Sequence, residues 1–170
     1  MPPIIVAGLD AYEAEQSSPV SETTGRVGGA SAIVGDWAEE LAIIGMRRNM
    51  LEVKLRRVIL GLIRAEILAK KGDASQVGDR IRASVSTERR RSLPVDPDQM
   101  MDKLFWLELL ALVEKEWQMM CAIFGDSAEF KSQGLIINER PDAHGKAFDA
   151  TDLALWKRSL EWFELRMSKV

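Results

Sequence analysis

The sequence is poor in residues that form disulfides or bind metals, because it holds one cysteine, Cys121, and one histidine, His144. A single cysteine excludes a disulfide within the chain and is typical of a reducing compartment. One cysteine and one histidine cannot supply the ligands of a structural zinc site. The chain also lacks a glycine-rich phosphate loop followed by lysine and Ser/Thr. We therefore expect neither a metal nor a cofactor.

Long hydrophobic runs are also missing. No stretch approaches the roughly 20 apolar residues of a membrane span, and residues 1–16 lack the basic start and apolar run of a secretory signal. The composition, 46% hydrophobic and 29% charged, is that of a folded globular protein. These features predict a cytoplasmic protein that does not bind membranes.

Charge is distributed unevenly along the chain. Residues 1–35 hold four acids and one base, residues 36–93 eight acids and thirteen bases, and residues 94–170 fourteen acids and nine bases. The basic middle third includes a run of three arginines, Arg89, Arg90 and Arg91. Such a run is either a hydrated basic segment or a surface that contacts the phosphates of RNA.

The chain divides into two predicted parts, a flexible leader or linker at residues 1–35 and a helical domain at residues 36–170. Ser, Thr, Gly and Pro are mixed in the leader without periodicity. The domain opens with Asp36, a good N-cap, followed by apolar residues at helical spacing. Lysines and then a glycine at residues 70–72 favour the end of this first long helix.

Further helices are predicted towards the C-terminus. One or two short helices are expected in the polar insert that follows the first helix, and one continuous apolar helix at residues 98–124 after the N-cap and proline at residues 96–97. Another is expected at residues 128–139, and the last begins near Asp149 or Thr151. No period-two alternation demands a strand. The fold class is therefore all-α, an antiparallel four-helix-bundle-like domain with a polar helical insert.

Most residues capable of chemistry are expected to be structural. Cys121 lies in the densest apolar helix, which favours a packing role over that of a nucleophile. The tryptophans and methionines stand at core spacing. Solvated helix faces are the expected positions of five acids, Glu108, Glu114, Glu116, Glu161 and Glu164.

The remaining candidate is INERPDAHGK, residues 137–146, because it places Arg140 four positions before the single histidine at a turn between helices. Histidine titrates near neutral pH and can move a proton between a ribose 2′-hydroxyl and a leaving oxygen. Arginine stays charged and can bind a phosphate through two parallel donors as negative charge develops. The pair suits RNA cleavage that requires no metal.

This segment and the final helix, INERPDAHGKAFDATDLALWKRSLEWFE, resemble the HEPN superfamily, and a looser resemblance extends back to residue 46. The resemblance implies a helical bundle that forms a homodimer and acts as a metal-independent endoribonuclease. Such domains serve toxin–antitoxin, antiviral defence and RNA-processing systems, so an antitoxin or defence-system partner is implied. Arg140 would bind phosphate, His144 would be catalytic, and Asn138 and Asp142 would be polar neighbours that orient them.

The motif departs from the family pattern in one respect. Only Pro141, Asp142 and Ala143 separate the arginine from the histidine, one residue fewer than is usual, and a proline takes a place that is usually polar. A one-residue change rotates a helical side chain by roughly 100°. A catalytically inactive dimerisation or interaction module, within a larger protein, is therefore the alternative function.

Overall fold

The computed structural model describes residues 29–139 and 149–170, with side chains from residue 38 onward. Within these ranges the chain is all-α, as predicted, and contains no strand. The structure divides the expected helices further and gives eight in the two described ranges. Their bounds are α1 Gly29–Ala69, α2 Ser75–Ala83, α3 Thr87–Arg90, α4 Pro97–Lys103, α5 Trp106–Lys115, α6 Trp117–Phe124, α7 Ser127–Asn138 and α8 Ala150–Met167.

Helix α1 differs from the prediction at both ends. It begins at Gly29, so Asp36 lies inside the helix and is not its N-cap. At the other end, Lys71 has the left-handed backbone (φ 54°), and the Gly72 N–H donates to the Ile67 carbonyl at 2.8 Å. The helix closes as predicted, but with the left-handed residue one position earlier.

The predicted continuous helix at residues 98–124 is wrong, because the chain breaks twice there. At the first break Phe105 is extended (ψ 162°), and its N–H donates to the Glu108 carboxylate at 2.8 Å. Arg56 of α1 donates to the carbonyls of Met101 and Leu104 at 2.8 and 2.9 Å. These bonds satisfy polar groups that an interrupted helix leaves exposed, so the break is stable.

The second break falls at Glu116, which has φ −94° and ψ 25°. Its carboxylate lies 3.3 Å from Arg80 of α2, and its side chain is 15% exposed. Glu108 is similarly covered, with a side chain 17% exposed and 3.3 Å from Arg89. The expectation that these two acids lie on solvated faces is therefore wrong, because an arginine from the polar insert pairs with each of them.

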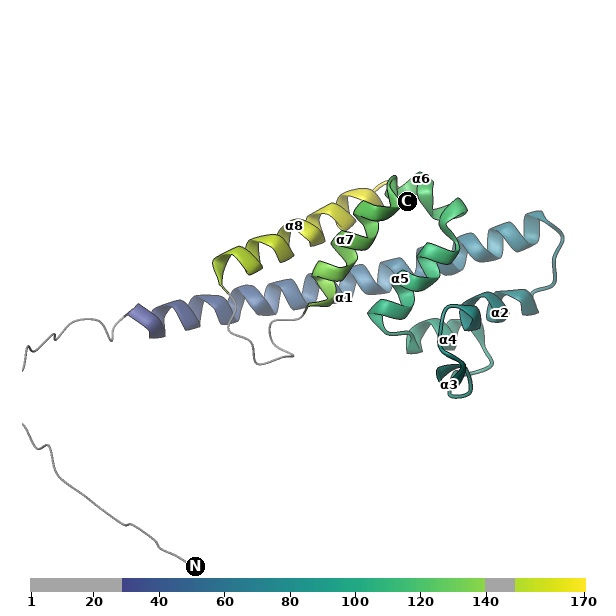
Figure 1. Cartoon of the computed structure of the whole chain (residues 1–170), viewed down its shortest axis with the longest axis horizontal. Helices are drawn as coiled ribbons and strands as arrows, with labels where there is room; N and C mark the ends of the chain where they lie inside the picture. Colours follow the sequence, from purple (N-terminus) through teal and green to yellow (C-terminus); the bar gives the residue numbers. More distant parts are fainter. Residues whose placement is uncertain (1–28, 140–148) are drawn as a thin grey trace, which may run out of the picture.

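Figure 1 shows α1 as a spine along the molecule, with α8 and α5 packed on it, α7 packed on α8 and α5, and α2, α3 and α4 towards the C-terminal end of α1. Helix α7 runs antiparallel to α5 and α8. Helices α1 and α8 run parallel, since Lys157 pairs with Glu40 at 2.9 Å and Glu164 with Arg47 at 2.7 Å. Mixed orientation thus distinguishes the fold from a simple antiparallel bundle.

The core is centred on the aromatic rings of α6, α7 and α8. Phe124, Phe130 and Phe163 are fully buried, with ring centroids 4.8 to 5.9 Å apart. Helix α8 is amphipathic: Leu153, Trp156, Leu160, Phe163 and Met167, which recur every three or four residues, are all buried, whereas Leu155 and Leu165 are exposed.

Cys121 does not have the packing role predicted for it, because its side chain is exposed on α6. This helix spans only Trp117–Phe124 and buries Met120 and Phe124, which lie on one face. Cys121 follows Met120 and is rotated by about 100° away from that face.

Among the described helices, none is both long enough and apolar enough to span a bilayer.

Candidate functional site

The candidate motif lies at the connection between α7 and α8. Asn138 is the last residue of α7 and is half-buried, and Glu139 follows as the C-cap. Arg140, Asp142 and His144 lie outside the described residues. The structure therefore defines the two ends between which the motif is held.

The C-terminal end of α7 is fixed by two indole groups. The Trp156 Nε1–H of α8 donates to the Ile136 carbonyl at 2.6 Å, and the Trp106 Nε1–H of α5 donates to the Gly134 carbonyl at 2.8 Å. The last carbonyls of a helix lack intrahelical partners, so the Trp156 bond satisfies such a group. It also ties α8 to a point four residues before Arg140.

The start of α8 is fixed by its own capping residues. The Asp149 carboxylate accepts hydrogen bonds from the N–H groups of Thr151 and Asp152 at 2.7 and 3.0 Å. The Asp152 carboxylate accepts from the Asp149 N–H at 3.1 Å, which completes a capping box. The backbone N–H of Asp152 and then that of Thr151 lower the pKa of Asp149, because they stabilise its charged form. The sequence predicted that the helix begins near Asp149 or Thr151, and the structure confirms that start.

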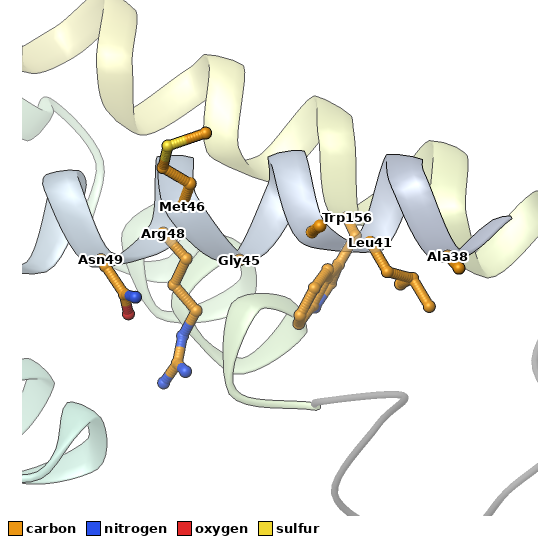
Figure 2. A pocket seen from close by; sticks show the side chains of 8 residues that line it. Ala38, Leu41, Gly45, Met46, Arg48, Asn49 and Trp156 are labelled. Carbon is orange, nitrogen blue, oxygen red and sulfur yellow. The ribbon is translucent and has the colours of Figure 1, made fainter. Parts of the chain in front are cut away.

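A pocket of about 580 Å³ lies between α1 and Trp156 of α8, the residue whose indole binds the Ile136 carbonyl of α7. Trp156 contributes to its wall, and the rest comes from one side of α1 (Figure 2). Small side chains leave the space open, and a Cβ placed on Gly45 would meet nothing within 4 Å. The lining residues are Ala38, Leu41, Ala42, Gly45, Met46, Arg48, Asn49 and Trp156.

Polar groups lie at one end of this pocket. The Arg48 guanidinium lies 5.8 Å from the centre of the Trp106 ring, and Figure 2 shows Arg48 and Trp156 extending to the same side of α1. Asn49 follows on the exposed rim. The pocket therefore combines a cation, an amide and an aromatic ring beside the point where the motif begins. Sequence reading missed it, although the spacing of Ala38, Ala42 and Gly45 on α1 marks a face of small residues.

The arginine run lies on α3, away from the α7–α8 connection (Figure 1). Arg89 donates to the Lys103 carbonyl at 2.5 Å and lies 4.5 Å from the centre of the Phe105 ring. Arg90 donates to the Val85 carbonyl at 3.1 Å, whereas Arg91 is exposed at the end of α3. The structure thus gives Arg89 and Arg90 packing contacts on α3.

No described cluster of three or more His, Cys, Asp or Glu side chains could hold a metal ion. Comparison of the chain with protein-family models, curated proteins and solved structures found no match. Function is therefore inferred from the residues of the site and from the resemblance carried by the motif.

Proposed function

We propose that the chain is a HEPN-like, metal-independent endoribonuclease, or an effector derived from one, in a prokaryotic defence or toxin system. It would act in the cytoplasm as a homodimer, and an antitoxin or another defence protein would be its partner. One observation carries the proposal: Arg140 and the single histidine, His144, share a short connection between two helices.

The proposed reaction is transesterification of RNA. The ribose 2′-oxygen attacks the phosphorus, the bond from phosphorus to the 5′-oxygen breaks, and a 2′,3′-cyclic phosphate and a 5′-hydroxyl result. His144 moves the proton, and Arg140 stabilises the charge that grows on the phosphate. Asn138 and Asp142 orient these two side chains. Since each chain has one histidine, a base and an acid that are both histidines require two copies.

The described surroundings support a site for a nucleotide at this connection. A pocket of about 580 Å³ has space for a nucleobase, with Trp156 in its wall and Arg48 and Asn49 at one end. Aromatic rings and arginine planes are the groups on which unpaired bases stack. A base next to the cleaved phosphate would occupy this pocket.

Purified protein incubated with single-stranded RNA in excess chelator tests the activity. We expect the wild type to cleave and His144→Ala to lose about 100 to 10,000-fold in rate, as for removal of a general acid or base. Lys146→Ala, in the same segment but outside the motif, is the matched control and should keep its activity. Absence of wild-type cleavage, or cleavage unchanged in His144→Ala, would refute the proposed catalysis.

An inactive dimerisation or interaction module is the second candidate. The exposed apolar side chains of α1 favour it, including Met46 at 59% and Met50 at 69% exposure, as does the shortened gap between Arg140 and His144. For such a module, His144→Ala should lower the melting temperature or the dimer affinity without any catalytic effect. An unchanged melting curve and dimer constant would count against this candidate, as would harm to cells that express the wild type and not His144→Ala.

A further inference from the structure

One face of α1 carries large apolar side chains that the other described helices leave exposed. Ile43 is 46% exposed, Met46 59%, Met50 69% and Val53 44%. Soluble monomers rarely display such a continuous apolar row, and large exposed patches mark interaction surfaces. We call Ile43, Met46, Met50 and Val53 the α1 stripe.

The α1 stripe has the spacing of a helix-pairing seam and charges of opposite sign at its ends. Its members are separated by three, four and three residues, the a/d pattern of paired helices. Glu39 lies four residues before the stripe and Arg57 four residues after it, and both are exposed. At about 100° per residue, all six positions fall within roughly 80° of arc. Neither charge forms a salt bridge within the described part of the chain.

A groove borders the stripe on the side of α8. Its volume is about 910 Å³, and Met50, Val53, Lys54 and Met167 are among its lining residues. Lys54 spans the groove, because its ammonium donates to the Met167 carbonyl at 2.5 Å. A partner helix on the stripe would therefore have a hollow beside it into which side chains can insert, as in ridges-into-grooves packing.

We propose that the α1 stripe pairs with the α1 stripe of a second copy, with the two helices antiparallel. One register places Glu39 against Arg57 of the second copy, Ile43 against Val53 and Met46 against Met50. Each pair occurs twice because the two-fold axis repeats it. The same register thus pairs the opposite charges at both ends of the stripes and buries the apolar side chains between them.

Self-complementarity is what identifies the occupant as a second copy. In a parallel pair, Glu39 would face Glu39 and Arg57 would face Arg57, and like charges at an interface oppose association. Two copies of this sequence in antiparallel order avoid that repulsion and bury the four apolar side chains of each stripe. Methionines at the centre suit such a seam, because they adapt to irregular packing.

The pairing would also fix where the two candidate sites of a dimer lie relative to each other. That arrangement rests on the proposed function, whereas the interface itself does not. The pocket lined by Ala38, Ala42 and Gly45 lies on one side of the stripe, and α8 lies on the other. The two-fold axis of this antiparallel pair passes near residue 48 and is perpendicular to the plane that contains both α1 helices. The pocket sides of the two α1 helices therefore face the same side of the dimer. Both pockets would open on one face, about 15–20 Å apart from helix rise and interaxial distance.

The first test measures the mass of the full chain in solution by sedimentation over a range of concentrations. We expect the wild type to be a dimer. Glu39→Arg or Arg57→Glu alone should raise the dissociation constant of the dimer about tenfold, because each variant places like charges together at both ends of the paired stripes. The double variant Glu39→Arg/Arg57→Glu should restore the affinity. Met50→Lys should give a monomer, whereas Val95→Lys, at a position 85% exposed outside α1, should not.

The second test fixes the register by disulfide formation in a Cys121→Ser background. Ile43→Cys and Val53→Cys proteins should cross-link when mixed and not when oxidised separately, because antiparallel pairing separates like positions by about 15 Å along the axis. A monomeric wild type, or cross-linking of each variant with itself, would overturn the proposal. A dimer without RNA cleavage would refute the proposed nuclease and leave this interface standing.

Discussion

At the scale of single residues, one arginine contacts two glutamates whose pKa values shift in opposite directions. Arg80 pairs with both Glu66 and Glu116. Lys70, followed by Arg80, lowers the pKa of Glu66 through side-chain hydrogen bonds. Burial raises the pKa of Glu116, and Arg80 offsets part of that effect. Neutralising these two carboxylates should therefore change the free energy of unfolding in opposite directions.

Glu66→Gln should lower the free energy of unfolding at pH 7 by about 1 kcal/mol, since it removes a partly buried ion pair. Glu116→Gln should leave this energy unchanged or raise it, because the ionised form is the one that burial disfavours. Urea unfolding at pH 7 measures both variants. A larger loss for Glu116→Gln than for Glu66→Gln would contradict this assignment.

The pH dependence follows from the same shifts. The stabilisation from Glu66, whose folded pKa is depressed, is present above the ordinary glutamate pKa of about 4.3 and lost as the pH falls through its lower folded value. Glu116, whose folded pKa is raised, favours the folded state while protonated, and this contribution is lost as the pH rises through its folded value. The difference between the two variants should therefore shrink at pH 4.

Two glycines allow a matched test of packing. A Cβ on Gly134 of α7 would lie 2.7 Å from a methyl carbon of buried Leu110, whereas a Cβ on Gly61 of α1 would meet nothing within 4 Å. Gly61→Ala should stabilise the protein by up to about 1 kcal/mol through helix propensity. Gly134→Ala should destabilise it by about 1–3 kcal/mol through overpacking. Thermal melting measures both, and a more stable Gly134→Ala would show that the α5–α7 contact is looser than described.

At the scale of helices, the break between α4 and α5 depends on a side chain from α1. Arg56→Met should remove the donors to the carbonyls of Met101 and Leu104 and destabilise the fold by about 2–3 kcal/mol. Hydrogen exchange at Leu104 and Phe105 should speed up. Arg158→Met, an exposed site on α8, is the control. Unchanged exchange in Arg56→Met would mean that the break does not need this arginine.

Local signals predicted several elements because the neighbouring residues alone determine them. Asp96 before Pro97 caps α4, as the sequence indicated, and Asp126 and Asp149 cap α7 and α8 close to the helix starts that the sequence predicted. The break at Phe105 was not predictable from periodicity, since the apolar pattern continues through it. The groups that stabilise this break include Arg56, which lies far away in the sequence.

The candidate site stays a prediction, because Arg140 and His144 lie outside the described residues. Their closeness in the sequence and the family resemblance together singled them out. The adjoining pocket joins residues of α1 to Trp156 of α8, and only the fold brings these together. Sequence patterns show that Trp156 is apolar and buried, but not that its N–H binds the Ile136 carbonyl near the motif.

At the scale of the whole molecule, α1 connects the features described above. One of its faces packs in the core, one side lines the pocket near the α7–α8 connection, and the α1 stripe remains exposed. The pocket and the α1 stripe adjoin on this helix, because Met46 belongs to both. Gly45→Leu should therefore weaken the proposed RNA cleavage and leave the dimer intact, because Gly45 lines the pocket and lies outside the α1 stripe.

Cleavage of RNA through its 2′-hydroxyl by Arg140 and His144 is the function proposed for this chain. The most direct test compares an RNA oligonucleotide with a 2′-deoxy oligonucleotide of the same sequence, incubated with the full chain in excess chelator, and identifies the product ends. We expect cleavage of the RNA alone, 2′,3′-cyclic phosphate ends, and loss of both in Arg140→Ala and His144→Ala. An intact RNA, or equal cleavage by the wild type and His144→Ala, would contradict it.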